Sequence, residues 1–182
     1  VIAYSQVKKT NIKKIPDVIE IGLSGNLEEK INYVKDKLNK EISVSEIFER
    51  GGLVDARGLT KGKGLSGAVK RFGITLKQHK SEKGRRRPGS LGPWHPARVT
   101  FRVPMAGQLG MFTRVVYNNN IINIGKAEGN IKGITNYGDV KAENLVLRGS
   151  IQGPHKRQIL LTYPLRPTRK QIKKNFEFME LR

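Results

Sequence analysis

The sequence predicts a mainly β protein with an α/β portion at its start, a small β-barrel body and a long, irregular basic extension. Short segments rich in β-branched residues recur at intervals of about 8–12 residues, which is typical of small barrels. Apolar residues follow a helical period early in the chain. From residue 61 to residue 110 neither period is sustained, and nine glycines and four prolines interrupt the pattern. A loop of this length is normally functional or disordered.

The start of the chain is predicted to alternate strands and helices. Residues 1–7 and 17–23 are rich in β-branched side chains, which favour strands. An amphipathic helix of about three turns is expected next, from apolar residues at helical spacing: Leu27, Ile31, Val34 and Leu38. Ser43 and Glu46 then form a capping-box pattern, which predicts that a short helix opens at this point.

Further strands are predicted after the glycine pair Gly51-Gly52, which we expect to end that short helix. These strands cover residues 53–60, 99–103, 113–117, 121–125, 144–150 and 157–163. The three asparagines of residues 118–120 are expected to form a turn between two of them. Residues 166–182 are predicted to be a basic C-terminal tail.

Charge is distributed very unevenly along this chain of 182 residues, whose formal net charge is +20. Residues 1–50 hold 9 basic and 8 acidic residues, whereas residues 61–114 hold 13 basic residues and a single acid, Glu82. Like charges repel one another in a compact state, so the excess indicates a polyanionic partner. No stretch approaches the roughly 18–20 apolar residues that a spanning helix needs, and no signal-peptide pattern is seen. Nucleic acid is therefore the expected partner.

The composition also argues against several kinds of chemical site. There is no cysteine, and the histidines His79, His95 and His155 are scattered without the spacing of metal ligands. We therefore predict no metal, no cofactor and no small-molecule substrate.

The segment from Gly58 to Gly67 combines glycines with lysines, so its backbone can approach an anion closely. Its likeness to a nucleotide-binding P-loop is superficial, because Lys63 is followed by Gly64 where that motif needs Ser or Thr. Two interpretations remain, a flexible solvated loop or a phosphate-binding loop. The adjoining Lys70-Arg71 favours the second.

The basic run of residues 77–87 is compatible with a nuclear-import signal, a solvated face or an RNA contact. Arginine pairs bidentately with phosphate and stacks on bases, so we favour the RNA contact. Trp94, the single tryptophan, follows this run between Pro93 and Pro96. A lone tryptophan more often belongs to a core, but these neighbours favour a rigid tip that stacks on an unpaired base. The adjacent His95 either donates to phosphate or is solvated.

Four segments, taken together, carry a family resemblance. They are Gly-Leu-Thr-Lys-Gly-Lys-Gly with Val-Lys-Arg-Phe-Gly, Leu-Gly-Pro-Trp-His-Pro-Ala-Arg-Val, Met-Ala-Gly-Gln-Leu-Gly, and residues 149–157. This combination closely resembles the universal large-subunit ribosomal protein three ("L-three") family, archaeal/eukaryotic type, from about Glu46 to Arg166. The resemblance implies a translation-protein-type β-barrel from residues 46–60 and 111–165, a central extension of residues 61–110, and an inserted α/β portion of residues 1–45.

The resemblance implies a structural constituent of the large ribosomal subunit, cytoplasmic and not an enzyme. Its expected partners are large-subunit ribosomal RNA and neighbouring ribosomal proteins, and it would support subunit assembly and translation. The tip at Trp94 would lie near the peptidyl-transferase centre. The residues expected to bind RNA are Lys61, Lys63, Lys70, Arg71, Lys77, Lys80, Lys83, Arg85, Arg86, Arg87, Trp94, His95, Arg98, Arg102, Arg114, Lys156 and Arg157.

One departure and two rival interpretations complete the expectations. Family members are longer at the N-terminus, so we expect the barrel to need strands from a separate N-terminal segment of the same protein. The first rival is an RNA-processing enzyme that uses His79 and His95 as acid and base, although such groups must be held within hydrogen-bonding reach of the substrate. The second is a non-ribosomal nucleic-acid-binding module.

Overall fold

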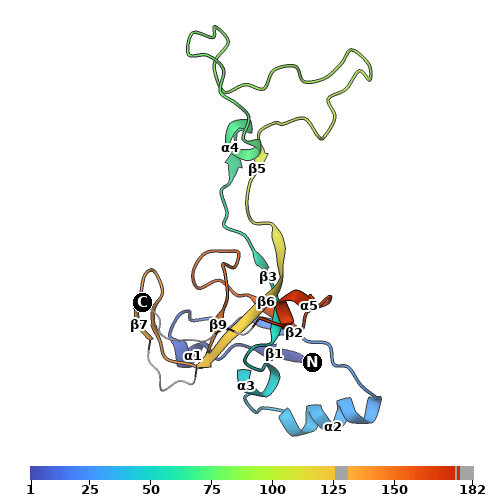
Figure 1. The fold of residues 1–182 in the computed structure, drawn as a ribbon, viewed down its shortest axis with the longest axis vertical. Helices are drawn as coiled ribbons and strands as arrows, with labels where there is room; N and C mark the ends of the chain where they lie inside the picture. The colour runs from blue at the N-terminus through green and yellow to red at the C-terminus, as the bar shows by residue number, and fades with distance from the viewer. Residues whose placement is uncertain (126–130, 175, 177–182) are drawn as a thin grey trace. The chain divides into compact units, whose positions relative to one another are not determined.

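The computed structural model describes residues 1–125, 131–174 and 176, with more strand than helix (Figure 1). The strands form several small antiparallel sheets, and their pairing within the described residues does not close into a barrel. The chain divides into two compact units. The first unit comprises residues 1–58 and 115–182, and the second comprises residues 59–114.

The N-terminal strands of the first unit pair with each other across a short helix. Strands β1 (Ile2–Tyr4) and β2 (Val18–Glu20) are antiparallel, so both predicted strands are confirmed, although each is shorter than expected. The chain then leaves the extended conformation, and Val7 begins helix α1 (Val7–Thr10). Asn11 ends this helix in the left-handed conformation, at φ +54°.

The two predicted helices that follow are both present. Helix α2 (Leu27–Lys37) matches the predicted amphipathic segment. Helix α3 (Val44–Ile47) begins at the predicted capping box, in which Ser43 Oγ accepts from the Ser45 N–H. The expected stop at Gly51-Gly52 was wrong, because Phe48 already takes an extended backbone conformation and ends the helix.

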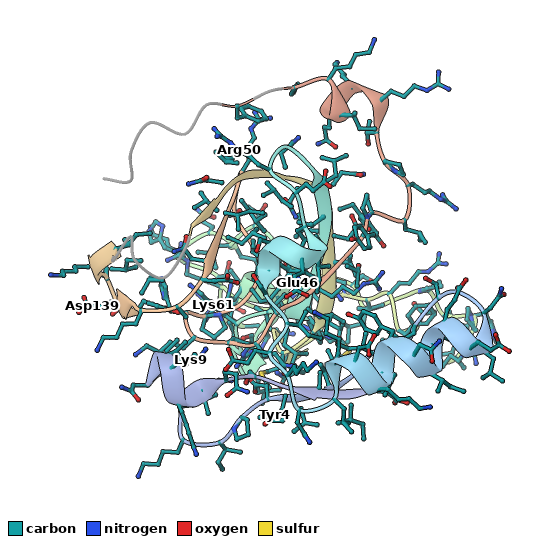
Figure 2. The ribbon with its side chains drawn as sticks, turned by 90° about the horizontal axis from the view of Figure 1, so that it is seen from below. Tyr4, Lys9, Glu46, Arg50, Lys61 and Asp139 are labelled. Atoms are coloured by element: carbon teal, nitrogen blue, oxygen red, sulfur yellow. The ribbon has the colours of Figure 1, made fainter. Side chains whose placement is uncertain are left out.

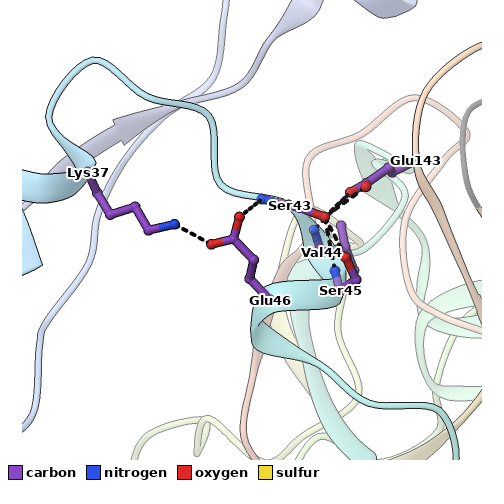
Figure 3. A network of polar contacts seen from close by, with 6 residues as sticks. All are labelled: Lys37, Ser43, Val44, Ser45, Glu46 and Glu143. Atoms are coloured by element: carbon purple, nitrogen blue, oxygen red, sulfur yellow. Dashed lines mark hydrogen bonds and ion pairs between the residues drawn. The ribbon is translucent and has the colours of Figure 1, made fainter.

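A polar cluster joins these helices to the loop before β9 (Figure 3). The Ser43 hydroxyl donates to the Glu143 carboxylate, with Oγ 2.7 Å and 2.9 Å from its two oxygens. The same carboxylate accepts from the Val44 N–H at 2.9 Å. Glu46 of α3 forms an ion pair with Lys37 of α2. A residue about 100 positions away in sequence therefore completes the cap of α3.

The main sheet has the strand order β10-β3-β6-β9. Its strands are β3 (Leu53–Leu59), β6 (Thr113–Gly125), β9 (Asn144–Leu147) and β10 (Leu160–Thr162). The predicted strand 53–60 is thus confirmed, and those at 144–150 and 157–163 are confirmed over shorter ranges. The core of this unit is small and consists of buried residues at the start of β3 and in β6: Leu53, Val54, Ala56 and Ile121.

The three asparagines do not form a turn; they lie within the continuous strand β6, so that prediction was wrong. The reason is a wholly buried carboxylate on β3. Asp55 accepts from the Asn118 N–H at 2.8 Å through Oδ1 and from the Leu165 N–H at 3.1 Å through Oδ2. Asn118 takes φ +57° to present its N–H, and the side chain of Asn120 donates to the Gln171 carbonyl at 3.1 Å.

Two further elements complete the first unit. A hairpin of strands β7 (Ile131–Ile134) and β8 (Gly138–Val140) was not predicted. Helix α5 (Arg169–Ile172) begins within the predicted basic tail.

The second unit contains short regular elements within the stretch that was expected to be irregular. These elements are β4 (Leu65–Ser66), α4 (Ala68–Phe72) and β5 (Gly107–Gln108). The predicted strand at residues 99–103 was wrong. Val103 instead donates its N–H to the Thr100 carbonyl at 3.2 Å, which closes a turn, and Pro104 supplies no N–H donor.

Candidate nucleic-acid interface

A paired stem, residues 60–66 with 107–112, begins the second unit. The Lys63 N–H donates to the Leu109 carbonyl and the Leu109 N–H to the Gly64 carbonyl, each at 2.9 Å. Strands β4 and β5 continue the pairing with Leu65 opposite Gln108. The backbone of the glycine-lysine segment is therefore fixed by hydrogen bonds to residues 107–112. The interpretation as a flexible loop does not apply to it.

Gly110 allows the two runs of the stem to lie unusually close. Its backbone has φ +78°, and a Cβ at this position would lie 1.9 Å from the Lys61 carbonyl oxygen. The left-handed conformation and the close approach both require glycine.

Arg71 of α4 is engaged by its own chain. Its Nε donates to the Gln108 carbonyl at 3.1 Å and its Nη1 to the Met105 carbonyl at 3.0 Å. The guanidinium thus ties α4, before the loop segment of residues 73–104, to β5, after it. We predicted Arg71 as an RNA contact, and the structure shows it in addition as a brace at the base of this loop.

A second internal brace lies within the loop segment. The Lys77 N–H donates to the Arg85 carbonyl, and Arg85 Nε donates back to the Lys77 carbonyl, both at 3.1 Å. These bonds close a small loop that carries Lys80 and Lys83, both exposed. Arg85 therefore uses one N–H donor to hold the basic run in shape, and its guanidinium remains positively charged.

Most of the other residues predicted to contact RNA in the second unit have side chains that are unpaired within the described part of the chain. They are exposed, and their side chains make no hydrogen bond or ion pair to the residues that the structure describes: Lys61, Lys63, Lys70, Lys77, Lys80, Lys83, Arg86, Arg87 and Arg98. The ion pairs in the described part of the chain all lie within residues 1–46, where Figure 2 labels Lys9 and Glu46. The positive charge of the extension is therefore not neutralised by described acidic side chains.

Trp94 is 89% exposed, and all of residues 91–100 are exposed. The indole therefore does not belong to a core of the second unit. His95, next to it, is also exposed, as are His79 and His155.

The remaining predicted contacts differ in their surroundings. The guanidinium of Arg102 lies 5.7 Å from the Phe101 ring centroid, and that of Arg114 lies 5.2 Å from the Phe112 ring centroid. Arg114 also donates to the Thr113 carbonyl. Lys156 and Arg157 belong to the first unit, where Lys156 is exposed and Arg157 is half-buried.

The described residues hold neither a cluster of metal-binding side chains nor a helix that could span a membrane. No group of three or more His, Asp or Glu side chains there is arranged to hold a metal ion. None of the described helices combines the length and apolar character needed to cross a bilayer.

Comparison with known proteins agrees with the motifs. The family model described as "Ribosomal protein L3" matches residues 1–180. The chain belongs to this family. The ribosomal protein L3 resemblance seen in the glycine-lysine and tryptophan segments is thereby confirmed.

Archaeal relatives named "Large ribosomal subunit protein uL3" match this L3-family chain closely. The protein of Nanoarchaeum equitans is 40% identical over 183 residues, covering 100% of this chain and 57% of the relative. That of Methanococcus vannielii is 41% identical, covering 92% of this chain and 52% of the relative. That of Archaeoglobus fulgidus is 44% identical over 85% of this chain and 48% of the relative. The chain spans about half the length of these curated relatives.

Sequence reasoning about this L3-family chain missed Phe101, whose side chain is 92% exposed. Its β-forming neighbours predicted a strand, whose side chains alternate between two faces, so the exposure of Phe101 did not follow from the sequence. The available signal was Pro104, which limits strand pairing, together with the flanking arginines Arg98 and Arg102.

Proposed function

We propose that this chain is an RNA-binding structural constituent of the large ribosomal subunit, without catalytic activity. The observation that carries the proposal is the accumulation of positive charge in residues 61–114, where 13 basic residues accompany a single acid and most of the basic side chains are exposed. Family membership supports it, since the relatives are named as large-subunit proteins. The ligand would be large-subunit ribosomal RNA.

The proposed mechanism is electrostatic and steric. Exposed lysines and arginines neutralise phosphates and release condensed counterions. Arg71 and Arg85 hold the backbone that presents them, and their remaining donors stay available to RNA, because guanidinium has five N–H groups. No cofactor takes part in this mechanism.

The roles that we propose for the segments of the chain are those expected from the sequence. Residues 61–110 form the extension into RNA, with Trp94 near its tip and directed toward the peptidyl-transferase centre. Residues 46–60 and 111–165 form the body, residues 1–45 an α/β portion, and residues 166–182 a basic tail. In this arrangement the body orients the extension, and the extension supports subunit assembly and translation.

We further propose that the main sheet is part of a translation-protein-type barrel that other segments complete. Its buried core is limited to a few side chains of β3 and β6, and both β9 and β10 are edge strands of the described sheet. An edge strand offers unpaired backbone groups to a further strand. A separate N-terminal segment of the same protein would supply such strands, and neighbouring ribosomal proteins would cover other surfaces.

The test measures how the affinity of the full chain for large-subunit RNA depends on salt. The logarithm of the binding constant should fall steeply and linearly with the logarithm of the salt concentration. The double variant Arg86→Gln/Arg87→Gln should lower the magnitude of the slope by about two, because each lost phosphate contact removes about one. Lys35→Gln, in the nearly neutral start of the chain, is the matched control and should leave the slope unchanged. A salt-independent affinity would contradict the proposal.

The same preparation separates the proposal from its rivals. Cleavage of labelled ribosomal RNA that is lost in His95→Ala would instead identify an enzyme. Preference for duplex DNA, with no association with large-subunit particles on a sucrose gradient, would identify a non-ribosomal module.

A further inference from the structure

Phe101 is the most exposed large hydrophobic side chain among the described residues, at 92%. Single exposed apolar residues are common on protein surfaces, so exposure alone indicates little. The backbone around Phe101 and the charges beside it make this position distinctive.

Phe101 lies in a tight turn and is exposed there. The Val103 N–H donates to the Thr100 carbonyl at 3.2 Å, which places Phe101 and Arg102 at the two corner positions of a four-residue turn. Side chains at such corners project outward. Pro104 follows directly and restricts the chain after the turn.

One guanidinium lies beside the ring, and a second arginine lies nearby in sequence. The Arg102 guanidinium is 5.7 Å from the ring centroid, and Arg98, three residues before Phe101, is exposed. The one acid of residues 61–114, Glu82, lies far away in sequence. An apolar protein groove that covered this ring would also have to desolvate the adjacent arginines, which is unfavourable without paired anions.

An unpaired nucleobase satisfies both features at once. Its flat face stacks on an aromatic ring, and the phosphates attached to it meet the flanking guanidinium groups. We propose that Phe101 is a second base-stacking site of the extension, separate from Trp94, with Arg102 contacting a phosphate next to the stacked base. This proposal rests on the proposed RNA-binding function.

The first experiment places a reporter at the site. In the full chain, Trp94→Phe combined with Phe101→Trp leaves one tryptophan, at position 101. The probes are a single-stranded 12-nucleotide oligoadenylate and an abasic ribose-phosphate strand of the same length. Stacking should quench the tryptophan emission with the oligoadenylate and leave it unchanged with the abasic strand. Equal responses to both probes would overturn the proposal.

Affinity measurements then separate stacking from a merely apolar contact. Phe101→Ala should weaken oligoadenylate binding about tenfold, while abasic-strand binding and the salt slope stay unchanged. Phe101→Tyr should retain the affinity for oligoadenylate. Phe101→Leu should weaken it as much as Phe101→Ala does. Leu65→Ala is the matched control, since Leu65 is 83% exposed in the same unit and not aromatic. It should have no effect.

Three outcomes have distinct meanings. If Phe101→Leu binds oligoadenylate as tightly as the unmodified chain does, the position is only an apolar contact. That result would overturn the stacking proposal. If Phe101→Ala is without effect while Arg86→Gln/Arg87→Gln weakens binding, the proposed function stands and this inference fails. If no form binds RNA, both fail.

Discussion

Asp55 connects three segments of the first unit. It is wholly buried, and it accepts backbone hydrogen bonds from two segments, at Asn118 and Leu165, that are distant from it in sequence. Ion pairs at the surface contribute little to stability, whereas a buried acceptor that two backbone N–H groups require contributes more.

Replacing Asp55 tests this role. Asp55→Asn keeps the shape of the side chain but turns an N–H donor toward one of the backbone N–H groups. We expect a loss of about 1–3 kcal/mol in the free energy of unfolding, because a buried N–H is left unsatisfied. Urea denaturation measures it. Asp139→Asn is the control, since that carboxylate accepts from the Gly133 N–H at an exposed hairpin. Equal effects of the two changes would contradict the argument.

Arg71 makes a second prediction at this scale. Arg71→Lys keeps the charge but cannot reach the Met105 and Gln108 carbonyls with a fixed pair of donors. The amides of Gly107 and Leu109 should exchange about tenfold faster with deuterium, because the brace of the stem is lost.

The neighbouring Lys70 supplies the control for this change. It is exposed, and its side chain makes no hydrogen bond or ion pair to described residues, so Lys70→Gln should weaken RNA binding and leave amide exchange in the stem unchanged. Unchanged exchange in Arg71→Lys would show that β4–β5 pairing alone closes the loop.

Between elements, the cluster at the start of α3 connects two helices with the loop before β9 (Figure 3). The pKa of Glu143 is lowered, first by the Ser43 hydroxyl and then by the Val44 N–H. The pKa of Glu46 is also lowered, mainly by its bond to Lys37, whose own pKa is raised by the same bond.

These shifts fix the sign of a pH effect. A carboxyl whose pKa is lowered by folding stabilises the fold above its unfolded pKa of about 4.3, and that stabilisation is lost as the pH falls through the lower, folded value. The Val44 amide proton should therefore shift in NMR spectra as the pH is lowered below about 4. Glu143→Gln should abolish this titration, and Glu28→Gln, at an exposed site, should not. A Val44 signal that titrates equally in all three proteins would refute the assignment.

The elements also show which features local sequence can predict. Helix α2 and the capping box of α3 follow from residues within a few positions of each other, and both were predicted. The asparagines of β6 have turn-forming side chains, but the carboxylate that accepts from the Asn118 N–H lies 63 residues away. Residues 99–103 have strand-forming side chains but no partner strand among the described residues, so their local propensity was not realised.

Over the whole molecule, the net charge of +20 opposes the compact state of the free chain. The unfolding midpoint in urea should therefore rise as sodium chloride is added, since a Debye length of about 10 Å at 0.1 M screens repulsion between exposed lysines and arginines. Salt also weakens the three described ion pairs, but such pairs contribute only about 0–1 kcal/mol each. Arg86→Gln/Arg87→Gln should show a weaker salt dependence. A midpoint that falls with salt would mean that attraction dominates.

The proposed binding surface follows from charge and composition as a region, but not residue by residue. Uneven charge located the second unit, and the tryptophan segment indicated exposure. The distinction between Arg71, which braces its own chain, and Arg86, which makes no side-chain hydrogen bond to described residues, depends on carbonyl groups 34 and 37 residues away from Arg71. Sequence spacing carries no information about such partners.

The contact between Gly110 and the Lys61 carbonyl has a consequence for how the stem assembles. If one run slipped by a single residue, Leu109 or Met111 would occupy the place of Gly110, and its Cβ would collide with the opposite backbone. Misaligned pairings thus carry a steric penalty that the native pairing avoids. The absence of a side chain at Gly110 therefore selects the native register of the stem. That register determines the positions of the stem lysines.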